Sequence, residues 1–443
     1  MLFRSLTRNA STSPGTVLTI TSTDIRVSGG IVDGGDSRAL PRSGRSPNIT
    51  VNGVDTVVSG ISAVTTSAAA ARVTIEKMTI RNAFNNAVSM NSSSSVRLSQ
   101  LYILNSGGTG INGTANSADV EGLVVEGCLI DRTGYTGNSS YYGGGIKLMG
   151  DQNDETSAGF RNRGMRIIGN DIRQPYLNFA GAEGAGGNEC VVYQEPNSKN
   201  GVVGHNVCVG GSIGISFSKN YGGTIVGNTV YGFSKLGLEV SNGDFCTVTG
   251  NIVDGGMGAG ENRVPAVVDN HNGIAIWTGA ADITVVGNTV RNLRARSDSY
   301  GIRVQLNTGN DGHVTVSDNV VSVRQDATGI YVNCTYGTTV TGNQVRCDES
   351  GTITGTTGIN LGIENSDATR TGRFVVTQNQ IRQAACAIRT SGTGTIKDTV
   401  VMQNVIYDCT AEYAKGGSVT VGDRTIWANN VGSVAAALRD DLL

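Results

Sequence analysis

A short phrase built around asparagine recurs ten times between residues 167 and 431. Each copy has a branched apolar residue, any residue, a residue that is most often glycine, asparagine, any residue and a second apolar residue, so that Ile225–Val230 reads IVGNTV. Self-similarity of this kind is the signature of a solenoid, in which each copy forms one structural repeat. The ten asparagines are Asn170, Asn206, Asn228, Asn251, Asn288, Asn319, Asn343, Asn379, Asn404 and Asn429.

The apolar positions of the phrase predict two short strands in every repeat. The residue three places before the asparagine is always Ile or Val, and the residue two places after it is Ile, Val or Cys. β-Branched residues favour strands and asparagine tolerates turn geometry, so we expect two strands that face one core across a tight bend. A third run with the pattern Gly-Ile-x-Val follows, as in Gly301–Val304 and Gly329–Val332, and supplies a third strand.

The repeats differ in length in a way that fixes the fold class. Asn206 and Asn228 are 22 residues apart, whereas Asn251 and Asn288 are 37 residues apart. A constant cross-section with extra residues leaving as loops describes an all-β, right-handed parallel β-helix. Earlier turns replace the asparagine with Met78, Leu101 or Cys128, which brings the expected number of coils to about thirteen or more.

The repeats also divide the chain. We predict a parallel β-helix over residues 71–432. Residues 1–70 are less regular, and their β-like runs predict further coils or an N-terminal cap. Residues 433–443 predict a tail or a short capping helix.

The asparagine column and the cysteines are predicted to be structural. Stacked asparagines can bond to one another and to the turn backbone. The eight cysteines lie far apart without a CxxC pair, and there are only three histidines, so we expect neither disulfides, nor a metal site, nor a cofactor.

Composition excludes several classes of protein. Glycine occurs 63 times without a Gly-X-Y period, which excludes collagen. The 34 basic and 36 acidic residues balance, so nucleic acid is not an expected partner. No stretch approaches 18 consecutive apolar residues, and the first 15 residues lack the apolar core of a signal peptide, so neither a membrane span nor a leader is expected.

The outward positions of the third strand predict a binding face. Alternation along a strand places charged and aromatic residues there, and long insertions flank the strand at residues 148–164, 173–189, 254–272, 306–313 and 362–372. A walled groove with isolated rings and polar groups is suited to a polysaccharide substrate. A solvated face without function is the alternative. The predicted substrate-binding residues are Trp277, Tyr193, Tyr331, Gln305, Asn333 and Lys147.

Five residues near the middle of this face are candidates for catalysis. Glu195 and Glu239 are expected two coils apart, about 9.6 Å between backbones, which approaches the roughly 6.5–9.5 Å carboxyl spacing of an inverting glycosidase. Asp269 is a closer partner for Glu239. Alternatively, His271 beside Arg303 could abstract the C5 proton of a uronate and drive β-elimination.

These repeats resemble those of the pectate-lyase-like superfamily of right-handed parallel β-helices, and in particular the tailspike and depolymerase proteins of bacteriophages. The resemblance covers Asn170 to Asn429, about two thirds of the chain. It implies a homotrimer, contacts with other virion or tail proteins, and cleavage of surface polysaccharide by carboxylates. The chain departs from that pattern, because neither an N-terminal capping helix nor a trimerisation domain is visible.

The segment from Asp269 to His271 also resembles the Asp-Pro-His element of alginate C5-epimerases, although Asn270 replaces the proline. The first hypothesis is therefore recognition and cleavage of a bacterial surface polysaccharide, by a glycosidase or a lyase, in a virion or outside the cell. The alternatives are a non-catalytic adhesin or structural rod, and a uronate lyase or epimerase.

Overall fold

The structure is a computed structural model of the 443-residue chain. Several features predicted from the sequence lie outside the described residues: Asp269, Cys334, the side chain of Glu195, residues 433–443, and most of each insertion predicted to flank the third strand. The described residues are 5–7, 17–33, 49–51, 54–56, 64–66, 70–83, 86–115, 120–133, 144–149, 162–173, 189–256, 271–277, 279–295, 297–306, 312–333, 337–348, 351, 353–363, 371–422 and 424–432.

Strands are the only regular elements of the described residues, and the chain divides into two compact units. Unit 1 comprises Met1–Ser234 together with Val264–Val268, and unit 2 comprises Lys235–Arg263 and Asp269–Leu443. In each unit a coil consists of one strand in each of three sheets, here called the first, second and third sheet in the order within one coil, counted from the strand that precedes the asparagine bend.

The first sheet carries the strand that precedes the asparagine bend. In unit 1 its order is β3 (Arg26–Ser28), β8 (Ala71–Glu76), β11 (Ser94–Ser99), β15 (Val124–Glu126), β19 (Arg166–Ile168), β22 (Val202–Gly204) and β25 (Thr224–Val226). In unit 2 it is β28 (Thr247–Thr249), β31 (Ile283–Val286), β34 (Val314–Ser317), β37 (Thr338–Thr341), β41 (Phe374–Thr377), β44 (Val400–Met402) and β48 (Ile426–Ala428).

The second sheet carries the strand that follows the bend. In unit 1 its order is β1 (Ser5–Thr7), β4 (Ile31–Asp33), β9 (Thr79–Ala83), β12 (Tyr102–Ser106), β16 (Leu129–Thr133), β20 (Asp171–Arg173), β23 (Val207–Val209) and β26 (Thr229–Tyr231). In unit 2 it is β29 (Ile252–Asp254), β32 (Thr289–Arg291), β35 (Val320–Ser322), β38 (Gln344–Arg346), β42 (Gln380–Arg382), β45 (Val405–Tyr407) and β49 (Val431–Gly432).

The third sheet carries the Gly-Ile strands. In unit 1 its order is β2 (Leu18–Ile20), β7 (Val64–Thr66), β10 (Val88–Asn91), β13 (Ile111–Thr114), β17 (Ile146–Met149), β21 (Glu189–Lys199) and β24 (Ile213–Tyr221). In unit 2 it is β27 (Leu236–Ser241), β30 (Asn272–Ile276), β33 (Tyr300–Gln305), β36 (Thr328–Asn333), β39 (Thr357–Ile363) and β43 (Cys386–Ile396), which also pairs with β40 (Thr371–Gly372), β46 (Ala411–Lys415) and β47 (Ser418–Val421).

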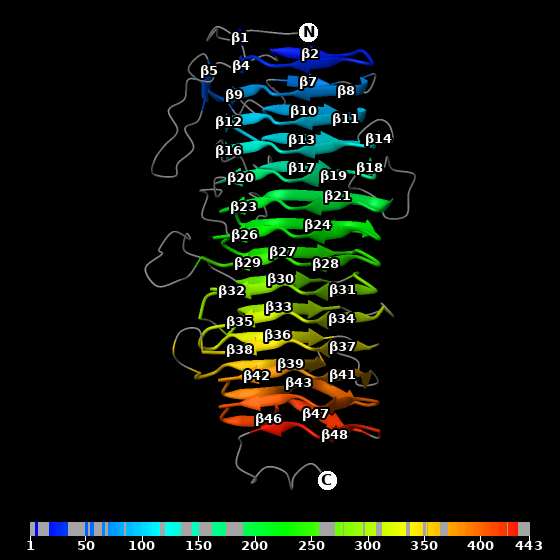
Figure 1. Cartoon of the computed structure of the whole chain (residues 1–443), viewed down its shortest axis with the longest axis vertical. Helices are drawn as coiled ribbons and strands as arrows, with labels where there is room; N and C mark the ends of the chain where they lie inside the picture. Colours follow the sequence, from blue (N-terminus) through cyan, green and yellow to red (C-terminus); the bar gives the residue numbers. More distant parts are fainter. Residues whose placement is uncertain are drawn as a thin grey trace. The chain divides into compact units, whose positions relative to one another are not determined.

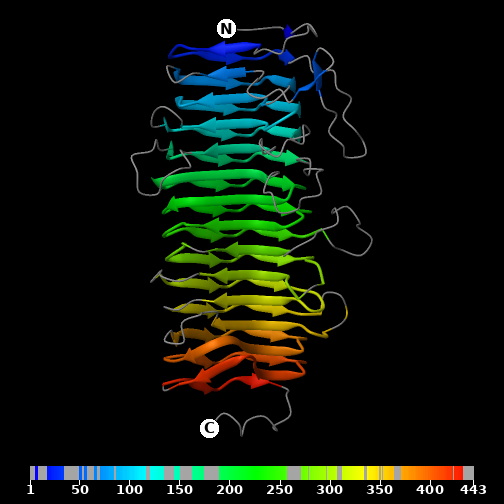
Figure 2. The same ribbon diagram turned by 180° about the vertical axis from the view of Figure 1, so that it is seen from behind.

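Strands from successive coils pair in parallel, so that β10, β13 and β17 of unit 1 lie side by side (Figure 1). The opposite view shows the same stacking for the strands of unit 2 (Figure 2). Two further pairs lie outside the three sheets: β5 (Ile49–Val51) with β6 (Val54–Thr56), which is antiparallel, and β14 (Val120–Glu121) with β18 (Asn162–Arg163). The prediction of a right-handed parallel β-helix is confirmed.

The N-terminal region contributes strands to all three sheets. β2 pairs with β7, β3 with β8 and β4 with β9, each in parallel. The irregular sequence before residue 71 therefore supplies strands that continue the sheets of unit 1.

The asparagines form a hydrogen-bonded ladder inside each unit. In unit 2 the Asn319 backbone N–H and side-chain Nδ2 both donate to Asn343 Oδ1, at 3.0 and 2.9 Å. The Asn343 Nδ2 also donates to Val316 O at 2.9 Å. The same pattern joins Asn170, Asn206 and Asn228 in unit 1. Because these amides are buried, the ladder satisfies backbone groups that the bends would otherwise leave unpaired.

The last step of the ladder corrects the predicted register. Asn404 donates to Asn430, not to Asn429, and Asn429 has a φ of 55°. In other copies this position before the ladder residue also has positive φ and is often glycine, as at Gly342. Asn429 takes the left-handed place because asparagine tolerates that conformation, and the ladder residue is the next one along the chain. Ile426 and Val431, for which the repeat predicts core positions, are 50% and 67% exposed.

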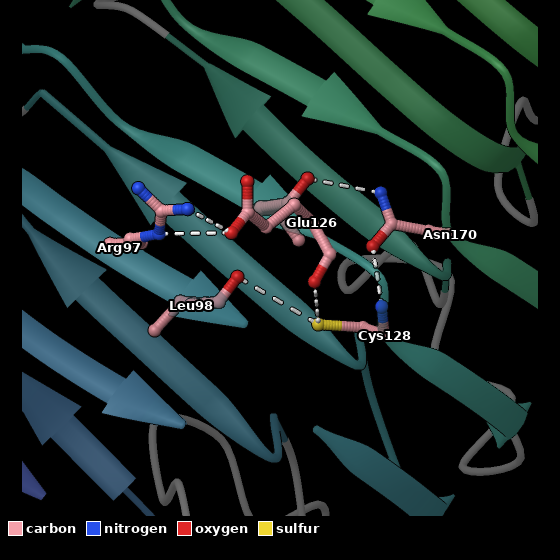
Figure 3. A network of polar contacts seen from close by, with 6 residues as sticks. Arg97, Leu98, Glu126, Cys128 and Asn170 are labelled. Carbon is pink, nitrogen blue, oxygen red and sulfur yellow. Dashed lines mark hydrogen bonds and ion pairs between the residues drawn. The ribbon is translucent and has the colours of Figure 1, made fainter. Parts of the chain in front are cut away.

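Cys128 continues the column at the start of the ladder (Figure 3). Its backbone N–H donates to Asn170 Oδ1 at 3.0 Å, and its thiol lies 3.5 Å from Glu126 O. The side chain is buried, and so are Met78 and Leu101 at the corresponding positions of earlier coils. On the outer side of β11 and β15, Arg97 forms an ion pair with Glu126.

Candidate functional site

The outer face of β27, β30, β33, β36 and β39 in unit 2, here called the candidate face, carries most of the predicted site residues. The parallel register sets Glu239 opposite Ala275, Ala275 opposite Arg303, Arg303 opposite Tyr331 and Tyr331 opposite Asn360. These residues form one row across five coils. Glu239 is the one acidic residue within these five strands.

A second row runs beside the first. Gln305 lies opposite Asn333, and Asn333 lies opposite Gly362. Trp277 directly follows β30, where its backbone N–H donates to Val240 O at 2.8 Å. Arg303 connects the two rows, because its Nη2 donates to Gln305 Oε1.

Arg303 is held by two aromatic rings, one from its own strand and one from the neighbouring coil. Its guanidinium carbon lies 4.8 Å from the centroid of the Trp277 ring and 4.7 Å from that of the Tyr300 ring. The Tyr300 ring in turn lies 5.3 Å from the Tyr331 ring at an angle of 48°. Cation–π contacts of this kind fix a planar cation without neutralising its charge.

Burial separates the residues of the face into two groups. Glu239, Trp277, Arg303, Gln305 and Asn360 are partly exposed and can reach a ligand. Tyr331 and Asn333, predicted to bind sugar, are only 3% and 4% exposed. Alternation gave their direction correctly, but neighbouring side chains cover them, so the prediction of direct stacking on Tyr331 is corrected: its ring packs against Tyr300.

Tyr193, for which alternation predicts an outward direction, is instead a core residue of unit 1. It is fully buried, stacks on Phe217 at 4.9 Å between ring centroids, and lies 3.5 Å from Met165 O through its hydroxyl. The register explains the error, because Tyr193 is paired with Phe217 and the residue before it, Val192, with Ser216. The alternation of β21 is therefore one residue out of phase with the prediction.

Lys147 lies at an outward position of unit 1 but is covered. Its side chain is 6% exposed and its Nζ lies 3.5 Å from Glu189 Oε2. Burial lowers the pKa of Lys147, and the nearby Glu189 carboxylate opposes that shift. An ammonium group enclosed in this way is a structural ion pair and not an open ligand contact, which corrects its predicted role.

His271 is fully buried immediately before β30. Its Nδ1 accepts a hydrogen bond from the Arg294 backbone N–H at 3.0 Å. A Cβ at Gly255 would come within 2.8 Å of the imidazole Cε1, so the ring is packed tightly between coils. The structure does not place His271 on the open face, where a base acting on a sugar would have to lie.

Glu195 belongs to β21 of unit 1, and Asp269 stands three residues before β30 in the sequence. The structure describes neither side chain. The structure thus brings together Glu239, Trp277, Arg303, Gln305, Tyr331 and Asn333, and it separates His271 from them by burial.

Sequence reasoning missed two features. Tyr300 contacts both Arg303 and Tyr331, and the only signal for it is an aromatic residue immediately before the Gly-Ile run. The second feature is a hollow on the outer face of the second sheet of unit 2, lined by Gln344, Arg346, Gln380 and Arg382 among others. Its signal is the repetition of Asn-Gln-Val/Ile-Arg in two consecutive coils, at Asn343–Arg346 and Asn379–Arg382.

Within the described ranges, no group of three His, Cys, Asp or Glu side chains is arranged to hold a metal ion. In the same ranges, no helix is long and apolar enough to cross a membrane.

Comparison with known proteins found no matching family model and no matching curated protein. Several solved structures are similar. The periplasmic alginate epimerase AlgG is 10% identical with a TM-score of 0.44, over 82% of this chain and 77% of that one.

Two further solved structures are also similar to this chain. A hyperthermoactive exopolygalacturonase from Thermotoga maritima is 11% identical with a TM-score of 0.42, over 78% of this chain and 84% of that one. PfbA, a surface adhesin of Streptococcus pneumoniae, is 14% identical with a TM-score of 0.37, over 91% of this chain and 73% of that one. By its own strand pairing and asparagine ladders, the chain is a right-handed parallel β-helix.

Proposed function

We propose that this chain binds an extended polysaccharide along the candidate face and cleaves it there. The observation that carries the proposal is the fixed guanidinium of Arg303, held over Trp277 and Tyr300 in the same row as the half-buried Glu239. A cation, a carboxylate, a partly exposed indole and several amides on one face suit the recognition of sugar hydroxyls and apolar sugar faces.

The binding roles follow from exposure. The Trp277 ring stacks on a sugar, because it is partly exposed and its position is fixed by the backbone bond to Val240 and by Arg303. Gln305 and Asn360 are partly exposed amides that donate and accept hydrogen bonds with hydroxyls. Asn360 Oδ1 already accepts from Ser391 Oγ at 2.9 Å, which orients its NH₂ group.

Cleavage is assigned to Glu239. As a general acid it protonates the glycosidic oxygen, while a second carboxylate takes a proton from the water that adds to the anomeric carbon. The candidate for the second carboxylate within unit 2 is Asp269, which stands three residues before β30 in the sequence, and β30 pairs with β27.

A uronate lyase or epimerase is the second possible activity. It needs a base that reaches the C5 proton of the sugar. The buried His271, whose Nδ1 is occupied by the Arg294 N–H, is poorly suited to that task. Burial of His271 therefore favours hydrolysis over elimination.

A non-catalytic adhesin or structural rod is the third possibility, since Glu239 is the one acidic residue of the five strands. We further propose the setting implied by the sequence resemblance, a homotrimeric bacteriophage tailspike that acts on the host surface. Light scattering on the purified chain tests the trimer: a molar mass near three times 45.9 kDa is expected, and a monomer contradicts it.

The activity is tested by incubating the purified protein with bacterial capsules and exopolysaccharides and measuring the masses of the products by mass spectrometry. Hydrolysis adds one water per cleaved bond, whereas elimination leaves unsaturated products without that mass. For a hydrolase, Glu239→Gln abolishes the release of oligosaccharides and leaves polysaccharide binding intact, because the amide keeps the shape of the side chain but cannot donate the proton.

Glu121→Gln is the matched control, since Glu121 is an exposed carboxylate of unit 1 whose side chain is 63% exposed. It leaves product release unchanged. Wild-type protein that binds a glycan but releases no product from it would favour the adhesin, and unsaturated products would favour the lyase.

A further inference from the structure

The outer face of the second sheet in unit 2 contains a hollow of about 560 Å³ that is separate from the candidate face. It lies over β35, β38, β42 and β45. Its lining residues are Val320, Val321, Ser322, Gln344, Val345, Arg346, Gln380, Arg382, Tyr407 and Asp408. From these residues we propose that the hollow, here called the second-sheet groove, binds a sugar unit that carries a carboxylate.

Strand register arranges the polar groups of the groove in two rows. Gln344 lies opposite Gln380 on the next coil, which stacks two side-chain amides. Two residues along, Arg346 lies opposite Arg382, and Arg382 lies opposite Tyr407. Since neighbouring strands are about 4.8 Å apart, the groups of each row repeat at a spacing close to the width of a sugar ring.

The two guanidinium groups have different environments. Arg346 is held by Asp348, with Nη2 donating to Oδ2 at 3.0 Å and Nε donating to Oδ1. The Arg346 guanidinium, and to a smaller extent that of Arg382, holds the pKa of Asp348 below its usual range, so Asp348 remains a carboxylate. Both guanidinium groups are exposed, but Arg346 is ion-paired with Asp348, whereas Arg382 acts on that carboxylate only through its charge.

This asymmetry selects the ligand. An exposed guanidinium presents a planar fork that matches a carboxylate in two parallel hydrogen bonds. The two amides beside it donate to and accept from hydroxyls, and the Tyr407 ring, 49% exposed, offers a surface for the apolar face of the sugar. Asp408, which also lines the groove, limits the total positive charge and so favours one carboxylate over a highly charged ligand.

The proposal does not depend on the chemistry of the candidate face. A groove of this kind could hold part of a long acidic glycan, or a glycan different from the one on the candidate face. It predicts binding of a short acidic oligosaccharide that survives substitution of Trp277.

The test measures binding of a galacturonic acid trisaccharide to the full chain by isothermal titration calorimetry at low ionic strength. Arg382→Gln weakens binding about tenfold or more, as expected when a charge-assisted pair is lost. Arg424→Gln is the control, because Arg424 is a 77% exposed arginine of unit 2 that pairs with Asp398 and does not line the groove. Tyr407→Ala weakens binding and Tyr407→Phe retains it, since the phenyl ring still covers the sugar.

Three results would overturn the proposal: no binding by the wild-type chain at millimolar trisaccharide, unchanged binding by Arg382→Gln, or equal binding of the neutral galactose trisaccharide. Loss of binding in Trp277→Ala together with unchanged binding in Arg382→Gln would assign the trisaccharide to the candidate face and reject the groove. Arg382 and Tyr407 are exposed, so their variants are expected to fold, which a thermal melt compared with the wild type confirms.

Discussion

The guanidinium of Arg303 lies over the indole of Trp277, with 4.8 Å between the guanidinium carbon and the ring centroid, although the two residues belong to different coils. The contact exists because β30 and β33 pair in register, which sets the residue after β30 beside the outward side chains of β33. The pairing of β30 with β33 thus brings the Arg303 cation and the Trp277 ring together on the candidate face.

Replacing Arg303 with lysine tests whether this planar contact matters for binding. The substituted side chain keeps the charge but loses the flat guanidinium, so we expect Arg303→Lys to weaken polysaccharide binding about as much as Arg303→Ala does. The loss of two ring contacts should also lower the free energy of unfolding by about 1 kcal/mol. Affinity electrophoresis in polysaccharide gels and chemical denaturation measure the two effects.

The control for this pair is Arg389→Lys, which changes an arginine of the same row that is two coils beyond Tyr331. It leaves the contact between Arg303 and Trp277 in place. Wild-type affinity in Arg303→Lys would mean that charge alone, and not the stacked plane, serves the ligand.

The ladder predicts a large and position-specific loss of stability. Asn343→Ala removes the acceptor for two donors of Asn319 and the donor to Val316 O, all buried. Unsatisfied buried groups cost about 1–3 kcal/mol each, so the variant should lose at least about 2 kcal/mol in urea denaturation.

Asn429→Gly is the matched control at the turn. Asn429 lies outside the ladder at a φ of 55°, a conformation that glycine adopts without strain. The change should therefore alter the free energy of unfolding by less than about 1 kcal/mol. Equal losses at Asn343 and Asn429 would contradict the register described above.

The fold could be predicted from the sequence alone because two features of the repeat, its apolar positions and its asparagine, both specify it. The apolar positions on either side of the asparagines from Asn170 to Asn404 face one core, as Val285 and Val290 do, and the asparagine itself satisfies the backbone groups of the bend. The same regularity placed Arg303 and Gln305 on one face with Glu239, since alternation continues across paired strands.

The burial and direction of the other candidate residues depend on contacts between side chains, which a sequence repeat does not specify. Alternation predicts the direction in which a side chain points but not whether neighbouring side chains bury it. Lys147 and Tyr331 therefore point outward and are nevertheless buried. β21 begins without a Gly-Ile run to set its phase, which is why alternation assigns Tyr193 to the wrong side. His271 is enclosed by residues of neighbouring turns, and nothing in its own segment signals that.

Gly201 provides a test of the inward position of Tyr193. A Cβ at Gly201 would come within 1.8 Å of the Tyr193 hydroxyl and 2.3 Å of its Cζ. Because the ring is stacked on Phe217 and fully buried, it cannot move aside easily, and Gly201→Ala should cost about 3 kcal/mol of stability.

Gly250→Ala is the comparison, since no atom lies within 4 Å of its Cβ position and only the φ of 62° opposes the change. It should cost about 1–2 kcal/mol. A smaller loss for Gly201→Ala than for Gly250→Ala in the same denaturation experiment would show that Tyr193 does not occupy the interior.

Cys128 predicts how stability depends on alkaline pH. Burial raises the pKa of its thiol to about 12 from 9.0, so the folded chain keeps the proton while the unfolded chain releases it above pH 9. The thiol's contribution to stability is therefore complete below pH 9 and is lost as the pH rises toward 12. Between pH 9 and 10.5 this loss amounts to about 2 kcal/mol.

Cys128→Ala should show a correspondingly smaller decrease in the free energy of unfolding between pH 8 and 10.5. The decrease is not abolished, because burial raises the pKa of Cys386 in the same direction. Identical pH profiles for the wild type and Cys128→Ala, measured by urea denaturation, would mean that the thiol is not enclosed beside Asn170 as Figure 3 shows.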